Sequence, residues 1–126
     1  MIYNIQSKED LDKHLSAATN KLVVLDFYAT WCGPCKLIAP QLEELSTLYS
    51  KDVVVLKINV DDCEEIAMDY NVSSMPTFVF MKNHEIMDTI VGGDSENLTK
   101  AVEKYLPNDT RINTNNQAIS LNQDEN

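Results

Sequence analysis

The sequence predicts an α/β domain of three layers, with a central mixed β-sheet flanked by helices. Short runs rich in β-branched residues alternate along the chain with stretches whose apolar residues recur at helical spacing. Toward the end of this pattern, two runs with period-two alternation stand close together, as in an antiparallel hairpin. Parallel strands with crossover helices, followed by a hairpin and a helix, give this architecture.

The first third of the chain predicts a strand, a helix and a second strand. A short strand is expected over Ile2–Ile5. A helix follows over Ser7–Thr19, where Ser7 and Asp10 form a weak capping box ahead of an apolar face. Lys21–Ala29 is nearly continuous in apolar residues, which is typical of a strand buried on both faces.

The middle of the chain repeats this order. Cys35–Tyr49 places its apolar residues on one helical face and carries Pro40 inside, which predicts a kink. Val53–Val60 is a second nearly continuous apolar run and predicts another buried strand. A shorter helix is expected over Asp62–Tyr70.

The last part of the pattern predicts a hairpin and a helix. The runs Thr77–Met81 and Glu85–Val91 alternate at period two across a short connection at 82–84. Asp94 is a suitable N-cap for a final helix, whose apolar face carries Leu98, Val102 and Tyr105.

Length and charge restrict the class of protein. The 126 residues fit one domain, and a 44% hydrophobic content is enough for a packed core. The net charge of −10 disfavours direct binding to nucleic acid or to anionic membranes. No run approaches the roughly 20 apolar residues of a membrane span, and the N-terminus does not resemble a signal peptide. Three cysteines are too few for a secreted disulfide scaffold, so an intracellular protein is expected.

The composition changes at Pro107. All nine aromatic residues precede it, whereas residues 108–126 contain four hydrophobic residues and six asparagines. Such a segment buries too little apolar surface to offset its ordering entropy. We therefore expect a folded domain over 1–106 and a disordered polar tail over 107–126.

Cys32 and Cys35 are the main candidates for chemistry. They stand between a buried strand and a helix, with Pro34 at a first-turn position where its missing N–H costs nothing. At this spacing the two Cβ atoms lie about 5–6 Å apart, and small adjustments bring them into bridging range. At the helix N-terminus, free N–H groups and the helix dipole lower the pKa of the Cys32 thiol, whereas Cys35 is expected to be more shielded. The pair divides into an attacking and a resolving thiol.

Two other interpretations of these cysteines are less favoured. A zinc site needs four ligands, and no second C-x-x-C is present, so Cys63 with His14 or His84 would have to complete it by coincidence of folding. The alternative of two inert core cysteines fits poorly with the strand–turn–helix context and the adjacent tryptophan. No metal site is expected.

The segment from Asp26 to Lys36, DFYATWCGPCK, resembles the active-site signature of thioredoxins. The segments at 75–78 (MPTF) and 91–93 (VGG) resemble two further signatures, and the similarity extends over residues 2–106. Cytosolic animal thioredoxins, including those of insects, are the nearest likeness. The resemblance implies the thioredoxin fold. The Gly-Pro pair between the cysteines favours a reducing thioredoxin over an oxidising disulfide isomerase.

Two charged residues interrupt the buried strands. Asp26 lies in an apolar run, so burial should raise its pKa, unless an edge position or a register slip exposes it. The resemblance implies that Asp26 accepts the proton of Cys35. Lys57 interrupts the neighbouring strand, where it either pairs with Asp26 and tunes its pKa or extends to solvent.

The resemblance also implies a surface that binds the substrate. In the family, the proline that matches Pro76 is cis and packs against the disulfide. The backbone of Met75 would then pair with an extended substrate. The residues of this expected surface are apolar or lack a side chain: Trp31, Gly33, Pro34, Met75, Pro76, Gly92 and Gly93.

Cys63 and His84 are expected to have no catalytic role. Some animal thioredoxins carry regulatory cysteines near Cys63, but the partner positions here are Tyr70 and Ser74, so Cys63 is expected to be structural, with a singly modified thiol as the alternative. His84 stands where the family normally has glycine, and a positive φ there would carry a modest stability cost.

These residues together predict a protein-disulfide reductase. No G-x-G-x-x-G fingerprint is present and no bound cofactor is expected, so electrons must come from a partner. The resemblance implies an NADPH-dependent thioredoxin reductase, disulfide-containing protein substrates, and a monomer in the cytoplasm, with a nuclear location left open. The alternative is a binding subunit whose docking surface and tail recognise a partner, with the redox chemistry incidental.

Overall fold

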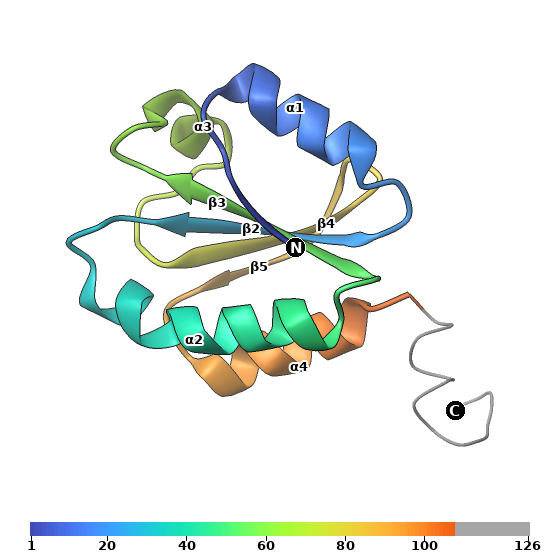
Figure 1. The fold of residues 1–126 in the computed structure, drawn as a ribbon. Helices are drawn as coiled ribbons and strands as arrows, with labels where there is room; N and C mark the ends of the chain where they lie inside the picture. The colour runs from blue at the N-terminus through green and yellow to red at the C-terminus, as the bar shows by residue number, and fades with distance from the viewer. Residues whose placement is uncertain (108–126) are drawn as a thin grey trace, which may run out of the picture.

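The computed structural model describes residues 1–107 and places five strands in one sheet, in the order β1-β3-β2-β4-β5 (Figure 1). The strands β1, β2 and β3 run parallel, β4 is antiparallel to β2, and β5 is antiparallel to β4. The mixed sheet confirms the predicted topology. In chain order the strands are β1 (Ile2–Asn4), β2 (Leu22–Tyr28), β3 (Val53–Asn59), β4 (Thr77–Lys82) and β5 (Glu85–Val91).

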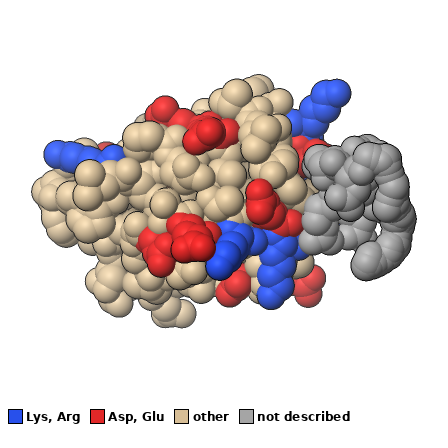
Figure 2. Space-filling view, turned by 90° about the horizontal axis from the view of Figure 1, so that it is seen from below, with Lys and Arg blue, Asp and Glu red and all other residues tan. Residues whose placement is uncertain are grey.

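Two pairs of helices cover the two faces of the sheet (Figure 1). Helices α1 (Lys8–Ala17) and α3 (Glu64–Asp69) pack on one face, and α2 (Gly33–Leu48) and α4 (Ser95–Tyr105) pack on the other. This confirms the three layers. Figure 2 looks onto the side of α2 and α4, where basic side chains lie beside acidic ones, and Lys100 pairs with Glu96 at 3.4 Å.

Strand β2 lies at the centre of the sheet and is buried on both faces, as predicted. Its side chains alternate between the two cores. Leu22 and Val24 pack with residues of α2 and α4, whereas Leu25 and Phe27 pack with residues of α1 and α3. By this alternation Asp26 points to the side that α2 covers.

The predicted N-caps of α1 and α4 are present. Asp94 accepts hydrogen bonds from the N–H groups of the next turn, and Ser7 Oγ accepts the N–H of Asp10 at 3.1 Å. The Asp10 carboxylate, however, accepts the N–H of Gln6 at 2.8 Å, one residue before the Ser7 N–H that a capping box would use. The cap is therefore a capping box displaced by one residue.

Some boundaries differ from the predictions. Helix α2 begins at Gly33, two residues earlier than expected, and continues through Pro40. Helix α3 begins at Glu64, since the N–H groups of Asp62 and Cys63 donate to the Asn59 carbonyl at 3.2 and 2.9 Å and form a turn before the helix. The period-two alternation of the hairpin predicts strands with one buried face, and this is wrong for β4. That strand is buried on both faces, because it lies between β2 and β5 and is covered by both helix layers.

The hairpin turn consists of two residues with positive φ. Asn83 and His84 have φ of 51° and 68°, so the expected left-handed position of His84 is present. Asn83 also accepts the N–H of Asn20 at 2.9 Å and donates to the Asn20 side chain at 3.1 Å. These two bonds join the hairpin to the turn before β2, at the sheet edge where β2 begins.

The described chain ends just after α4, where Leu106 is buried in the core. Except for Pro107, the predicted tail lies outside the described residues, so its disorder stays a prediction. Within residues 1–107, no helix is long and apolar enough to cross a membrane.

Candidate active site

The reactive pair lies where β2 passes into α2, at the C-terminal edge of the sheet. Cys32 is the N-cap of α2, and its Sγ accepts the N–H of Cys35 at 3.2 Å. The two cysteines form a disulfide, and their Cα atoms are 5.3 Å apart. When the disulfide is reduced, an N–H directed at Sγ and the N-terminal end of a helix both favour a thiolate on Cys32.

Both cysteines are buried in this disulfide form. Cys32 is 5% exposed and Cys35 is 8% exposed, so the expected difference in shielding is absent. The two pack into a small cluster with Tyr28, Ala29, Val60 and Met75. The position at the helix N-cap, rather than exposure, is what distinguishes Cys32 from Cys35.

Asp26 is buried beneath this end of α2. The residue is 6% exposed and lies in the central strand, which excludes an exposed edge position or a register slip. Burial raises the pKa of Asp26 from 3.8 to about 6, and the charge of Lys57 opposes this rise. The carboxyl therefore exchanges protons within the neutral to mildly acidic range, as a group that accepts a proton during the reaction must.

Lys57 lies opposite Asp26 in the parallel register of β2 and β3. Its ammonium nitrogen lies 4.7 Å from the centroid of the Tyr28 ring, in a cation–π contact. Within the described residues it forms no ion pair with Asp26. Lys57 therefore lowers the pKa of Asp26 through its charge, without a direct ion pair. This arrangement lies between the two expected ones, a pair with Asp26 and a side chain that extends to solvent.

The residues of the expected substrate surface come together around the disulfide. The Met75–Pro76 peptide bond is cis, as the resemblance implied, and Met75 packs against the cysteine pair. Pro76 itself is buried, so it supports this surface from below, whereas Trp31, Gly33, Pro34 and Gly93 are exposed. We call the set formed by Trp31, Gly33, Pro34, Met75, Pro76, Gly92 and Gly93 the docking surface.

The glycines allow close packing within the docking surface. The N–H of Gly92 donates to the Pro76 carbonyl at 2.8 Å, and Gly92 has a φ of 111°, which side chains rarely adopt. A Cβ on Gly93 would lie 3.3 Å from Pro34. The two glycines therefore let the segment after β5 lie against the start of α2.

Trp31 is the most prominent residue of the docking surface, with a fractional exposure of 66%. Its Nε1–H donates to Asp61 Oδ2 at 2.9 Å. The sequence prediction did not include Asp61. A usable signal existed, because Asp61 follows a buried strand at the sheet edge that carries the cysteines.

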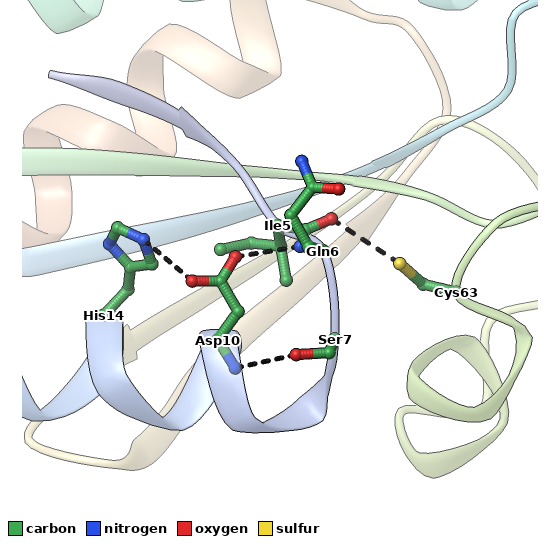
Figure 3. A network of polar contacts seen from close by, with 6 residues as sticks. All are labelled: Ile5, Gln6, Ser7, Asp10, His14 and Cys63. Carbon is green, nitrogen blue, oxygen red and sulfur yellow. Dashed lines mark hydrogen bonds and ion pairs between the residues drawn. The ribbon is translucent and has the colours of Figure 1, made fainter.

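Two of the residues considered for zinc, Cys63 and His14, have other partners. Figure 3 shows Cys63 Sγ directed at the carbonyl of Ile5, 3.6 Å away, and His14 facing Asp10 at 3.4 Å. Burial raises the pKa of the Cys63 thiol, which disfavours its reactive thiolate form. Among residues 1–107, no three His, Cys, Asp or Glu side chains are grouped to hold a metal ion.

Comparisons with known proteins identify the family. The Thioredoxin family model matches residues 3–104. Thioredoxin-T of Drosophila melanogaster is 55% identical over 105 residues, covering 83% of this chain and 67% of that protein. Thioredoxin of Mus musculus is 45% identical over 105 residues, covering 83% of this chain and 99% of that protein.

A solved structure agrees in fold as well. The germline-specific thioredoxin Deadhead of Drosophila melanogaster superposes with a TM-score of 0.78 at 44% identity, covering 81% of this chain and 97% of that one. A fold, a reactive pair and relatives of this similarity lead to one assignment. The chain belongs to the thioredoxin family and is a thiol-disulfide oxidoreductase, a protein-disulfide reductase that uses its own Cys32–Cys35 pair and needs no bound cofactor.

Proposed function

We propose that Cys32 attacks the disulfide of a protein substrate and that Cys35 resolves the intermediate. The Cys32 thiolate forms a bond to one substrate sulfur and releases the other as a thiolate. Cys35 then attacks Cys32 Sγ, which forms the Cys32–Cys35 disulfide and releases the second substrate sulfur. The substrate gains two electrons, which the Cys32 and Cys35 sulfurs lose, and its two thiolates take up two protons, one that Cys35 gave up and one from solvent. The observation that carries this order is the N–H of Cys35 donating to Cys32 Sγ at the start of α2.

Asp26 accepts the Cys35 proton in this scheme. The scheme is supported by the burial of Asp26 on the α2 side of the sheet and by the rise of its pKa to about 6. A carboxylate in this range takes a proton more readily than one at 3.8. Lys57 tunes Asp26, because its charge lowers a pKa that burial raises.

The docking surface holds the substrate while the disulfides exchange. Its exposed members are apolar or lack a side chain, which suits an extended segment of a partner that carries a disulfide. The backbone of Met75, next to the cysteine pair, would form strand-like hydrogen bonds with that segment. Trp31 provides the largest exposed apolar area of this surface.

Electrons reach the pair from an NADPH-dependent thioredoxin reductase, and the protein works as a monomer in the cytoplasm, with a nuclear location open. Reduction by such a partner is what membership of the family implies. The docking surface then serves the reductase and the substrates in turn, because both must reach Cys32.

Reduction of insulin tests the scheme, with electrons from dithiothreitol in one arm and from NADPH with thioredoxin reductase in the other. We expect wild type to be active in both arms and Cys32→Ser to be inactive in both. Cys35→Ser should accumulate mixed disulfides through Cys32, detected by mass spectrometry of the trapped complexes.

Three results would contradict parts of the proposal. Equal activity of wild type and Cys32→Ser would favour the alternative of a binding subunit with incidental redox chemistry. Trapping by Cys32→Ser instead of Cys35→Ser would reverse the order of attack. Activity with dithiothreitol but none with thioredoxin reductase would exclude that reductase as the electron donor and leave the rest of the proposal standing.

A further inference from the structure

Trp31 is held by a chain of hydrogen bonds that begins on β3. Asn59 is the last residue of β3, and its Oδ1 accepts the N–H of Asp61 at 2.9 Å. Asp61 Oδ2 in turn accepts the indole N–H of Trp31 at 2.9 Å. Two side-chain hydrogen bonds therefore connect the end of a buried strand to an exposed aromatic ring beside Cys32.

The series of hydrogen bonds is also attached to β2, the strand that leads into the reactive pair. Asn59 pairs in register with Tyr28 of β2, and the N–H of the next residue, Val60, donates to the Tyr28 carbonyl at 2.9 Å. Trp31 follows Tyr28 by three residues. Asn59 and Trp31, the two ends of this series of hydrogen bonds, are therefore both attached to the same part of the sheet.

The Asn59 carbonyl also shapes the turn that carries Asp61. It accepts the N–H groups of Asp62 and Cys63, so Asn59 bonds the turn through its backbone and its side chain. Four hydrogen bonds hold this turn, one from each backbone N–H of residues 60–63. Asp61 therefore has little freedom to move away from the indole N–H of Trp31.

We propose that Asn59 is a positioning residue for disulfide exchange, which acts through Asp61 to hold the Trp31 indole in the orientation that a substrate meets. The proposal rests on the docking surface under Proposed function. An exposed ring that is already ordered does not have to be immobilised when the substrate binds, so affinity rises without a further contact. Cys32 and its chemistry are untouched by this ordering.

The single tryptophan of the chain makes the proposal measurable, because all tryptophan fluorescence comes from Trp31. In the oxidised full-length protein, we expect Asn59→Ala and Asp61→Ala to lower the fluorescence anisotropy of Trp31. In insulin reduction both variants should raise KM about fivefold, the effect of ordering one large side chain on binding. The kcat should stay within about twofold, since one side chain's order and not the chemistry is changed.

Conservative variants separate positioning from structural damage. Asn59→Asp and Asp61→Asn retain an oxygen acceptor for the next N–H, and both should remain near wild type in anisotropy and KM. Asn59→Leu keeps the side-chain volume without the acceptor and replaces Asn59→Ala if that variant does not fold. Asn83→Gly removes two similar bonds at the opposite edge of the sheet and should change neither readout.

Unchanged anisotropy and KM in Asn59→Ala would overturn the positioning role, as would a fall in kcat with unchanged anisotropy. An anisotropy change without a KM change would show that the ring's order is irrelevant to binding and would also overturn it. If Trp31→Ala has a normal KM, the docking surface itself is wrong, whereas the reductase activity stands on its own assay.

Discussion

At the scale of single residues, Asp26 combines a proposed function with a stability penalty. Its pKa in the folded chain, about 6, lies above the 3.8 of an unperturbed aspartate because the carboxyl is buried. Below about pH 3 the carboxyl is protonated in both states, so it has no effect on stability. Above about pH 6 both states are ionised, and the folded state carries a buried charge.

We predict that Asp26→Asn stabilises the oxidised protein at neutral pH. The difference between 3.8 and about 6 corresponds to about 3 kcal/mol above pH 7, and the gain should shrink to near zero below about pH 3. Urea unfolding of both proteins at pH 3 and pH 8 measures it. The variant should also reduce insulin more slowly, because the proton acceptor for Cys35 is lost.

An equal gain at the two pH values would contradict this account, since the charge would then not be its source. Asp26→Glu serves as the control, because it keeps a buried ionisable carboxyl and with it the pH dependence. A variant that is stabilised and fully active would leave the penalty intact and remove the proposed role in the reaction.

The site residues differ in how far the sequence could predict them. The spacing and the strand–helix context of Cys32 and Cys35 predict a dithiol because the relevant contacts lie within one helical turn. The place of Asp61 after a buried strand marks it as a candidate, but its hydrogen bond to Trp31 joins residues 30 positions apart, so the partner could not be predicted. The burial of Cys32 likewise depends on Met75, which reaches the pair from a distant loop.

At the scale of elements, the β4–β5 hairpin contains a residue poorly suited to its backbone. His84 has a φ of 68°, where the Cβ of a side chain crowds the backbone and glycine has no such contact. Its neighbour Asn83 shares a positive φ, but its side chain makes two hydrogen bonds to Asn20. The two turn residues should therefore respond oppositely to replacement by glycine.

We predict that His84→Gly stabilises the protein by about 0.5–1 kcal/mol, as relief of left-handed strain exceeds the entropy cost of glycine. Asn83→Gly should lower stability, since its side-chain bonds are lost. Denaturant midpoints of the two variants and wild type provide the test. A midpoint for His84→Gly at or below that of wild type would mean that the turn carries no relievable strain.

Most elements were predictable because their signals are local. Continuous apolar runs predicted β2 and β3, and the caps Ser7 and Asp94 predicted the starts of two helices. The start of α3 was not predictable, because the N–H groups of Asp62 and Cys63 donate to the Asn59 carbonyl and form a turn where the helix was expected to begin. The burial of β4 depends on its place between two strands, which its alternation alone does not reveal.

At the scale of the whole molecule, the folded unit is expected to end at Leu106. We predict that a chain ending at Leu106 melts within about 2 °C of the full chain, since the 108–126 segment has few apolar residues to bury. Insulin reduction should be unchanged. Differential scanning calorimetry of the two proteins measures the transition.

A chain ending at Tyr105 is the matched control, because it also loses the buried Leu106 side chain. It should be less stable by about 2–5 kcal/mol, as other losses of a buried leucine are. If the chain ending at Leu106 shows no cooperative melting transition, the predicted boundary is wrong.

The order of the strands has a consequence for how the protein fluctuates. β2 is hydrogen-bonded on both sides and covered on both faces, whereas β1 has three residues and, among residues 1–107, β5 is paired with a strand on one side only. Amide hydrogens at the two borders can exchange with solvent through small local openings, but those of β2 exchange only when most of the sheet separates. The Cys32–Cys35 pair therefore repeats its cycle of bond making and breaking just after the strand that is the last to lose its native hydrogen bonds.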